Sequence, residues 1–138
     1  MTPDLLKKLK SKIPATRDDA ALKLIDFIEE AKAILIEQIM KKENENHHGT
    51  LVYALSFLNC SQNFEFAFEV LLKHKYESFI EAFAIIESNN YVLNEKTIYK
   101  CRKMYLDFIK NIDKQNYSVE EKNERLRKIS AVYEWFLK

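Results

Sequence analysis

The sequence predicts an all-α protein built from stacked helical hairpins. Apolar residues recur at spacings of three and four along most of the chain, which is the pattern of amphipathic helices. The 138 residues include one Gly and two Pro. Sandwiches and barrels need many tight turns, which use Gly, Asn and Pro, so this composition disfavours a β fold. Three segments also share one helical pattern at a fixed offset of 31 residues, which indicates a repeat.

Capping residues predict where the first two helices begin. Thr2 is expected to be the N-cap of the first helix, with Pro3 at its first helical position. Pro14 is expected to close this segment. Thr16 then becomes the N-cap of a second helix, which continues through Ile28 with apolar residues at helical spacing.

Six further helices are expected, separated by short polar loops that make neighbouring helices antiparallel. They cover 34–40, His48 or Thr50 to Leu58, 64–72, 79–86, 94–112 and 118–137. The two clearest helix N-termini are at Asn94, a good N-cap, and at Ser118, which is expected to form a capping box with Glu121. The longer helices over 94–138 do not follow the period, and we expect them to form a terminal cap.

The repeat aligns the second, fourth and sixth helices. Equivalent positions are Arg17, His48 and Phe79; Ala20, Leu51 and Ala82; and Leu24, Leu55 and Ile86. We expect Leu24, Leu55 and Ile86 to be buried, because each hairpin needs a neighbour to cover its apolar face. Residues 1–138 are thus expected to form one domain, with repeat units at about 3–28, 32–58 and 63–88 and the cap at 94–138.

The segment around the second helix resembles a known repeat family. Thr16, Arg17, Ala20 and Leu24 match the second-helix signature of HEAT-type repeats, although His48 and Phe79 replace the arginine in the next two units. The similarity covers roughly residues 3–90 and is to HEAT-like and armadillo-like proteins of a short bacterial type. It implies a right-handed α-α superhelix of about four stacked antiparallel hairpins. It also implies a scaffold whose inner surface binds another macromolecule.

Charge and composition exclude several functions. The net charge is +1, divided as +2 over residues 1–42, −5 over 43–93 and +4 over 94–138. We do not expect nucleic acid as a partner, since its binders are usually strongly basic. Neither GxGxxG nor GxxxxGK[ST] occurs, which argues against a nucleotide site. No apolar run approaches 18 residues, so a membrane partner is not expected either.

The reactive side chains do not form a recognisable catalytic or metal-binding pattern. His47 and His48 are adjacent and therefore point in different directions, whereas metal sites on helices use His at i and i+4. Cys60 and Cys101 lie among apolar neighbours and are expected to be packed, reduced thiols in a cytoplasmic protein. We expect no catalytic residue, metal or cofactor.

The predicted function is a non-enzymatic protein–protein interaction module, such as a bacterial immunity protein or an adaptor. The acidic middle of the chain favours a basic partner protein, for example a nuclease toxin. The predicted partner-binding strip, expected to be partially exposed, comprises Arg17, Asp18, His48, Tyr53, Phe79 and Glu81. The alternative is an enzyme on a HEAT-like scaffold, similar to a DNA glycosylase or a tetrapyrrole lyase.

Overall fold

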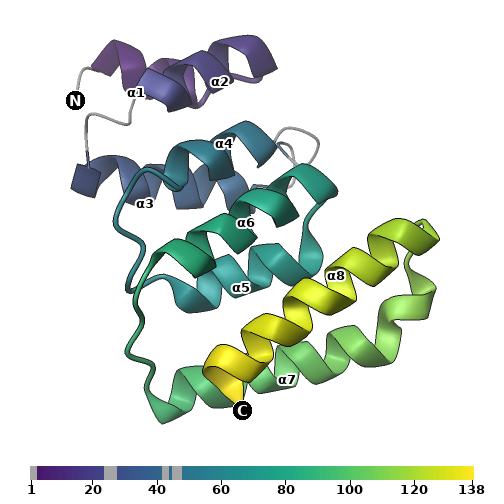
Figure 1. Ribbon diagram of the computed structural model, residues 1–138. Coiled ribbons are helices and arrows are strands. Elements are labelled where there is room, and N and C mark those ends of the chain that lie inside the picture. Colours follow the sequence, from purple (N-terminus) through teal and green to yellow (C-terminus); the bar gives the residue numbers. More distant parts are fainter. Residues whose placement is uncertain (1–2, 24–27, 42–43, 45–47) are drawn as a thin grey trace.

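Helices account for most of the described backbone in the computed structural model, which covers residues 3–23, 28–41, 44 and 48–138 (Figure 1). Within these ranges there are eight α-helices and no strand, as the sequence predicts. The helices are α1 (Pro3–Leu9), α2 (Pro14–Lys23), α3 (Ile28–Met40), α4 (His48–Leu55), α5 (Phe64–Lys73), α6 (Tyr76–Ser88), α7 (Glu95–Asn111) and α8 (Val119–Val132). None of these helices combines the length and the apolar character needed to cross a membrane.

Two predicted helix boundaries in the first repeat unit are wrong. Pro14 is the first residue of α2 rather than the end of the preceding segment, and Thr16 therefore lies inside the helix. Proline is favoured at this first helical position because its missing N–H would have no partner there. Ile28, predicted to lie in the second helix, is part of α3. The expected N-cap Thr2 lies outside the described residues.

The later boundaries agree better with the prediction. Helix α4 begins at His48 but ends at Leu55, so Leu58 lies in the following turn. Asn94 is the N-cap of α7, where its Oδ1 accepts a hydrogen bond from the Thr97 N–H at 2.8 Å. Ser118 caps α8 in the same way, accepting from the Glu121 N–H at 3.1 Å.

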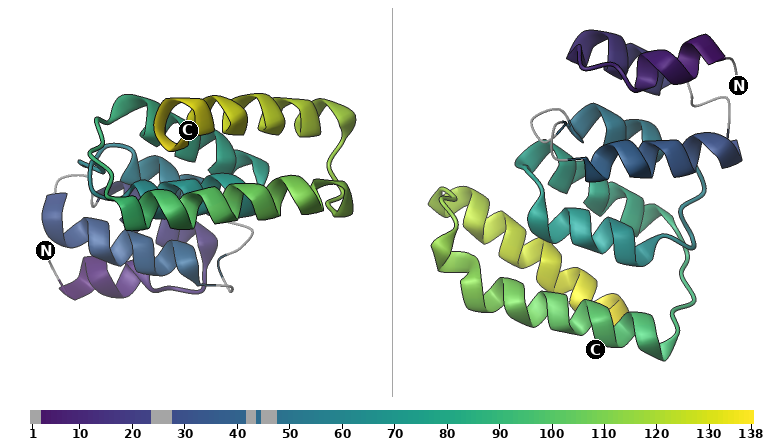
Figure 2. Two further views of the ribbon diagram at one scale, coloured as in Figure 1. Left: turned by 90° about the horizontal axis from the view of Figure 1, so that it is seen from below. Right: turned by 180° about the vertical axis from the view of Figure 1, so that it is seen from behind.

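The helices form four antiparallel pairs that lie in successive layers (Figures 1 and 2). The second helices form a continuous series in which α2 contacts α4, α4 contacts α6 and α6 contacts α8. Among the first helices, α5 packs extensively against α7. A single π-helical turn, Tyr133–Leu137, follows α8 and closes the last pair by packing against α7.

The repeat positions that face the neighbouring helices are buried. Leu55 and Ile86 are 1% and 0% exposed, which confirms their prediction, while Leu24 lies outside the described residues. Ala20, Leu51 and Ala82 are likewise buried. Alanine at two of these positions lets consecutive second helices approach closely, and the interior between layers is apolar.

Candidate functional site

Three of the six predicted partner-binding residues are buried rather than exposed. Arg17, His48 and Phe79 are 1%, 5% and 0% exposed, so the expected partially exposed strip is wrong at these positions. Arg17 donates a hydrogen bond to Asn44, which in turn donates to the Gln38 carbonyl at 3.0 Å. These three equivalent residues lie where consecutive hairpins pack together, and there they hold the layers in place.

A groove between α4 and α6 brings two of the other predicted residues together. Tyr53 comes from α4 and Glu81 from α6. The groove encloses about 340 Å³ and is also lined by Gly49, Thr50, Tyr76, Glu77 and Ile80. We call it the acidic groove. Asp18 lies on α2, part-exposed, with its carboxylate 3.8 Å from Arg17 Nε.

Exposed aromatic rings and carboxylates dominate the acidic groove. The side chains of Tyr53 and Tyr76 are 43% and 42% exposed. Phe57, just beyond α4, packs edge-on against Tyr53 with ring centroids 5.0 Å apart. Partial burial raises the pKa of Glu81. The described residues that line the groove include two glutamates and no lysine or arginine, so a positively charged ligand is attracted there.

Two local contacts fix the shape of the acidic groove. The Tyr76 hydroxyl donates to the Glu124 carboxylate at 2.8 Å, which raises the pKa of Tyr76 and lowers the pKa of Glu124. Gly49 lets α4 approach α6, because a Cβ there would lie 2.9 Å from the Glu77 Cβ. No side chain other than hydrogen fits at that distance without moving α6.

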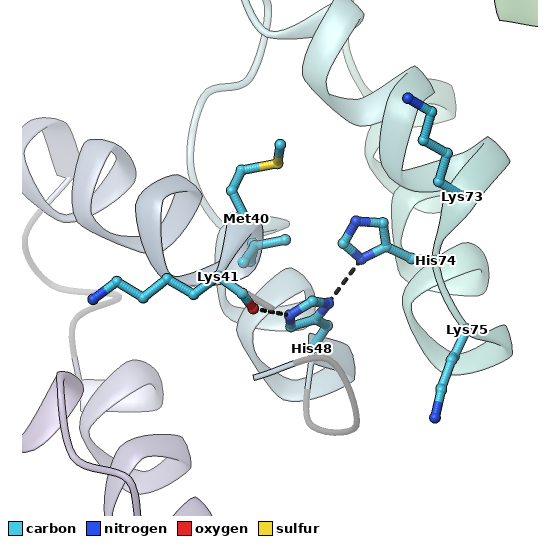
Figure 3. Close-up of a pocket in the computed structure, with 7 residues that line it drawn as sticks. Met40, Lys41, His48, Lys73, His74 and Lys75 are labelled. Atoms are coloured by element: carbon cyan, nitrogen blue, oxygen red, sulfur yellow. Dashed lines mark hydrogen bonds between the residues drawn. The ribbon is translucent and has the colours of Figure 1, made fainter. Parts of the chain in front are cut away.

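A second hollow is lined by His48 and lies where the loop ends of two hairpins meet (Figure 3). His48 Nδ1 and His74 Nδ1 are 2.8 Å apart, and His48 Nε2 lies 3.3 Å from the Lys41 carbonyl oxygen. Lys73 and Lys75 flank His74 and also line the hollow. We call this space, of about 300 Å³, the basic hollow.

Arg125 of α8 joins the last hairpin to the same region. It is 1% exposed, and its Nη2 donates to the His74 carbonyl at 3.0 Å. Its guanidinium lies between two rings, 4.7 Å from the Phe79 centroid and 4.5 Å from the Tyr117 centroid. Its Nε donates to Glu121 at 2.8 Å. The loop between α5 and α6 is therefore linked to the preceding hairpin through His48 and to α8 through Arg125.

His74, Arg125 and Tyr76 were not predicted from the sequence as members of these clusters. His74 pairs with a residue 26 positions away and Arg125 with one 51 positions away. Neither separation matches the repeat offset, so periodicity does not reveal these contacts. The one available signal was that His74 follows a helix end between two lysines.

The two cysteines are packed thiols, as predicted. Cys60 and Cys101 are 1% and 0% exposed. Burial raises the pKa of Cys60 to about 11 and that of Cys101 to about 12. Because the thiolate is the reactive form, the raised pKa disfavours either cysteine as a nucleophile near neutral pH.

Comparison of the chain with protein-family models, with curated proteins and with solved structures finds no match. What is established is the class of fold: the described residues form an all-α protein of eight helices, packed in pairs.

We expect chelators to leave the stability of the protein unchanged. In the described part of the chain, no three His, Cys, Asp or Glu side chains are grouped as metal ligands. His47 lies outside that part. Thermal unfolding followed by circular dichroism with and without EDTA tests this expectation. A melting temperature several degrees lower in EDTA would instead indicate a metal bound by His47, His48 or His74.

Proposed function

We propose that the protein is a non-enzymatic protein–protein interaction module that binds a basic segment of another protein in the acidic groove. The observation that carries the proposal is the combination of exposed rings and unneutralised carboxylates around one hollow. Tyrosine is enriched among residues that dominate binding energy, and charge complementarity speeds association. Asp18 remains a proposed contact on the adjacent helix α2.

The proposal includes the HEAT-like character of the protein and a right-handed superhelical stack, cytoplasmic in location. The continuous series of second helices supports it, because helical-repeat proteins bind partners along such a series. A scaffold of packed hairpins also holds the groove residues in place, so little entropy is lost on binding. Immunity to a basic toxin and an adaptor role both suit this surface.

An enzyme similar to a DNA glycosylase fits the acidic groove poorly. Such an enzyme holds phosphates, which needs lysine or arginine along the groove. Glu77 and Glu81 provide the opposite charge.

A peptide selection tests the proposal without knowledge of the natural partner. Random dodecapeptides displayed on phage are selected on the immobilised protein, and the enriched peptides are synthesised for fluorescence polarisation. We expect them to be rich in Lys and Arg. Their affinity should fall at least about tenfold with Tyr53→Ala and with Glu81→Lys, because each removes a central groove contact. Raising the salt concentration should also weaken binding.

Two matched variants control for general effects. Tyr99→Ala removes an equally large ring that is 61% exposed on α7, and Glu87→Lys reverses an exposed charge elsewhere on α6. Both should bind like the wild type, and circular dichroism should show that all four variants are folded. Selection that yields no basic peptide, or peptides that bind the groove variants and the controls equally, contradicts the proposal.

A further inference from the structure

The outer side of α7, at the end of the stack, exposes large apolar side chains. Tyr99, Leu106 and Ile109 are 61%, 62% and 37% exposed. Their spacing of seven and three residues places them on one side of the helix, opposite Cys101 and Phe108, which pack into the core. The left view of Figure 2 looks at this end of the stack, where α7 and α8 lie side by side.

The beginning of α8 adds a further apolar side chain, Val119, which is 71% exposed. We call Tyr99, Leu106, Ile109 and Val119 together the end face. Terminal units of helical-repeat proteins usually have a polar outer side, because no further unit packs against them. Large apolar side chains gathered on such a surface indicate that the surface contacts something else.

Unpaired basic side chains surround the end face. Five exposed basic residues of α7, α8 and the turn between them form no ion pair with another described residue: Lys96, Lys103, Lys110, Lys114 and Arg127. Lys103 and Lys110 follow Tyr99 and Leu106 by four residues each, so they lie beside them on the helix. The Lys103 ammonium is 5.1 Å from the centroid of the Tyr99 ring, which places a cation and an exposed ring together.

The acids at this end of the molecule offset little of that charge. Asp113 pairs with Lys122, and Glu134 pairs with Lys138 at 3.0 Å. Glu95 forms no ion pair with a described residue, but it lies in the first turn of α7, where the helix dipole favours a negative charge. Residues 94–138 as a whole carry a net charge of +4. The end face is therefore apolar with a positively charged border.

We propose that the end face binds the surface of a membrane that contains anionic lipids. Helix α7 has 17 residues and is about 26 Å long, so its outer side is able to lie along a bilayer. Tyrosine and lysine suit the headgroup level, while leucine, isoleucine and valine reach the boundary of the acyl chains. Side chains that protrude suit a fluid surface that adapts to them, whereas a folded protein partner would need matching pockets.

Membrane binding of this kind does not require a spanning helix. A helix that lies in the plane of the membrane surface needs apolar residues on one side only, so the finding that no described helix is able to cross a membrane is compatible with it. The end face also shares no residue with the acidic groove. The proposed function of the groove and the proposed membrane binding are therefore tested separately.

Flotation of the protein with lipid vesicles tests the proposal. One set of vesicles is phosphatidylcholine with about 30% phosphatidylserine, and the other is phosphatidylcholine alone. We expect binding to the anionic vesicles to be at least about tenfold tighter, because the basic border is attracted to phosphatidylserine. Salt at about 0.5 M should release most of the bound protein, since it screens this attraction.

Two pairs of substitutions separate the contributions of charge and apolar contact. Lys103→Gln with Lys110→Gln should weaken binding to the anionic vesicles at least about tenfold, because each basic residue near the surface contributes about fivefold. Tyr99→Ala with Leu106→Ala should weaken it at least about fivefold and leave its dependence on salt unchanged, since no charge is removed.

Matched pairs elsewhere on the molecule serve as controls. Lys73→Gln with Lys100→Gln removes the same charge from residues that each pair with a glutamate of α5. Tyr53→Ala with Val92→Ala removes exposed apolar side chains outside the end face. Both control pairs should bind vesicles like the wild type. Because Tyr53→Ala also disrupts the acidic groove, unchanged vesicle binding would hold whether or not the groove binds a basic segment.

The proposal is wrong if the protein does not bind the anionic vesicles at about 1 mM accessible lipid. It is equally wrong if the end-face variants, shown to be folded by circular dichroism, bind like the control pairs. Release from the vesicles by a soluble glutamate-rich peptide at the same concentration of charge would indicate an acidic protein partner instead. A dimer that dissociates with Tyr99→Ala and Leu106→Ala would indicate a second copy, and would also contradict the proposal.

Discussion

Replacement of Arg125 by alanine is expected to lower the free energy of unfolding by about 3–4 kcal/mol. The side chain is buried and forms hydrogen bonds through Nε and Nη2. It donates to the His74 carbonyl and to Glu121, and it stacks between Phe79 and Tyr117. Alanine removes two charge-assisted hydrogen bonds, two cation–π contacts and much buried area at once. It also leaves the His74 carbonyl without its donor.

Urea unfolding of Arg125→Ala beside Arg127→Ala measures this effect. Arg127 lies on the same helix and is exposed, so its removal is expected to change the free energy of unfolding by less than about 0.5 kcal/mol. Hydrogen exchange should show that α8 loses most protection in Arg125→Ala, because that variant loosens the last hairpin. A loss below about 1 kcal/mol would mean that Arg125 does not fasten α8 to the stack.

Replacement of Leu55 by alanine is expected to cost about 2–5 kcal/mol. Leu55 is 1% exposed, and its helix α4 packs against α2, α3 and α6 at once. Truncation therefore opens a cavity between layers that cannot close unless several helices move. The helices on both sides should become less stable together.

The matched substitution is Leu106→Ala on α7, where the leucine is 62% exposed. The same atoms are removed there without a cavity, and the free energy of unfolding should change by less than about 1 kcal/mol. Comparison of the two midpoints in urea isolates the effect of burial. Similar losses at both positions would show that position 55 is not a core position of the repeat.

The parts of the fold that depend on local chemistry were predictable from the sequence. Asn94 and Ser118 cap their helices as expected, since a side chain that satisfies the first N–H groups acts within three residues. Leu55 and Ile86 were placed in the core by periodicity alone. Thr16 was misplaced because both it and Pro14 are good starting residues, and only packing decides between them.

The candidate sites were harder to predict because they depend on contacts between distant residues. Charged residues are usually exposed, so nothing in the sequence marks Arg125 as a buried contact of His74. The exposure of Arg17, His48 and Phe79 was predicted wrongly because equivalent repeat positions were taken to share one surface. The three residues do occupy equivalent positions in their repeat units, but these positions lie between the layers and not on the surface. Tyr53 and Glu81 were found because α4 and α6 lie side by side.

The series of contacts along α2, α4, α6 and α8 gives the molecule a mechanical asymmetry. In the described residues, α2, α4 and α6 are joined extensively along this edge, whereas the last layer is joined more extensively through α5 and α7 on the opposite edge. A pulling force applied to the two ends of the chain would therefore separate the first three layers and the last layer from opposite edges. The two terminal pairs, α1 with α2 and α7 with α8, each have a neighbour on one side only, so both would detach before the middle pairs separate.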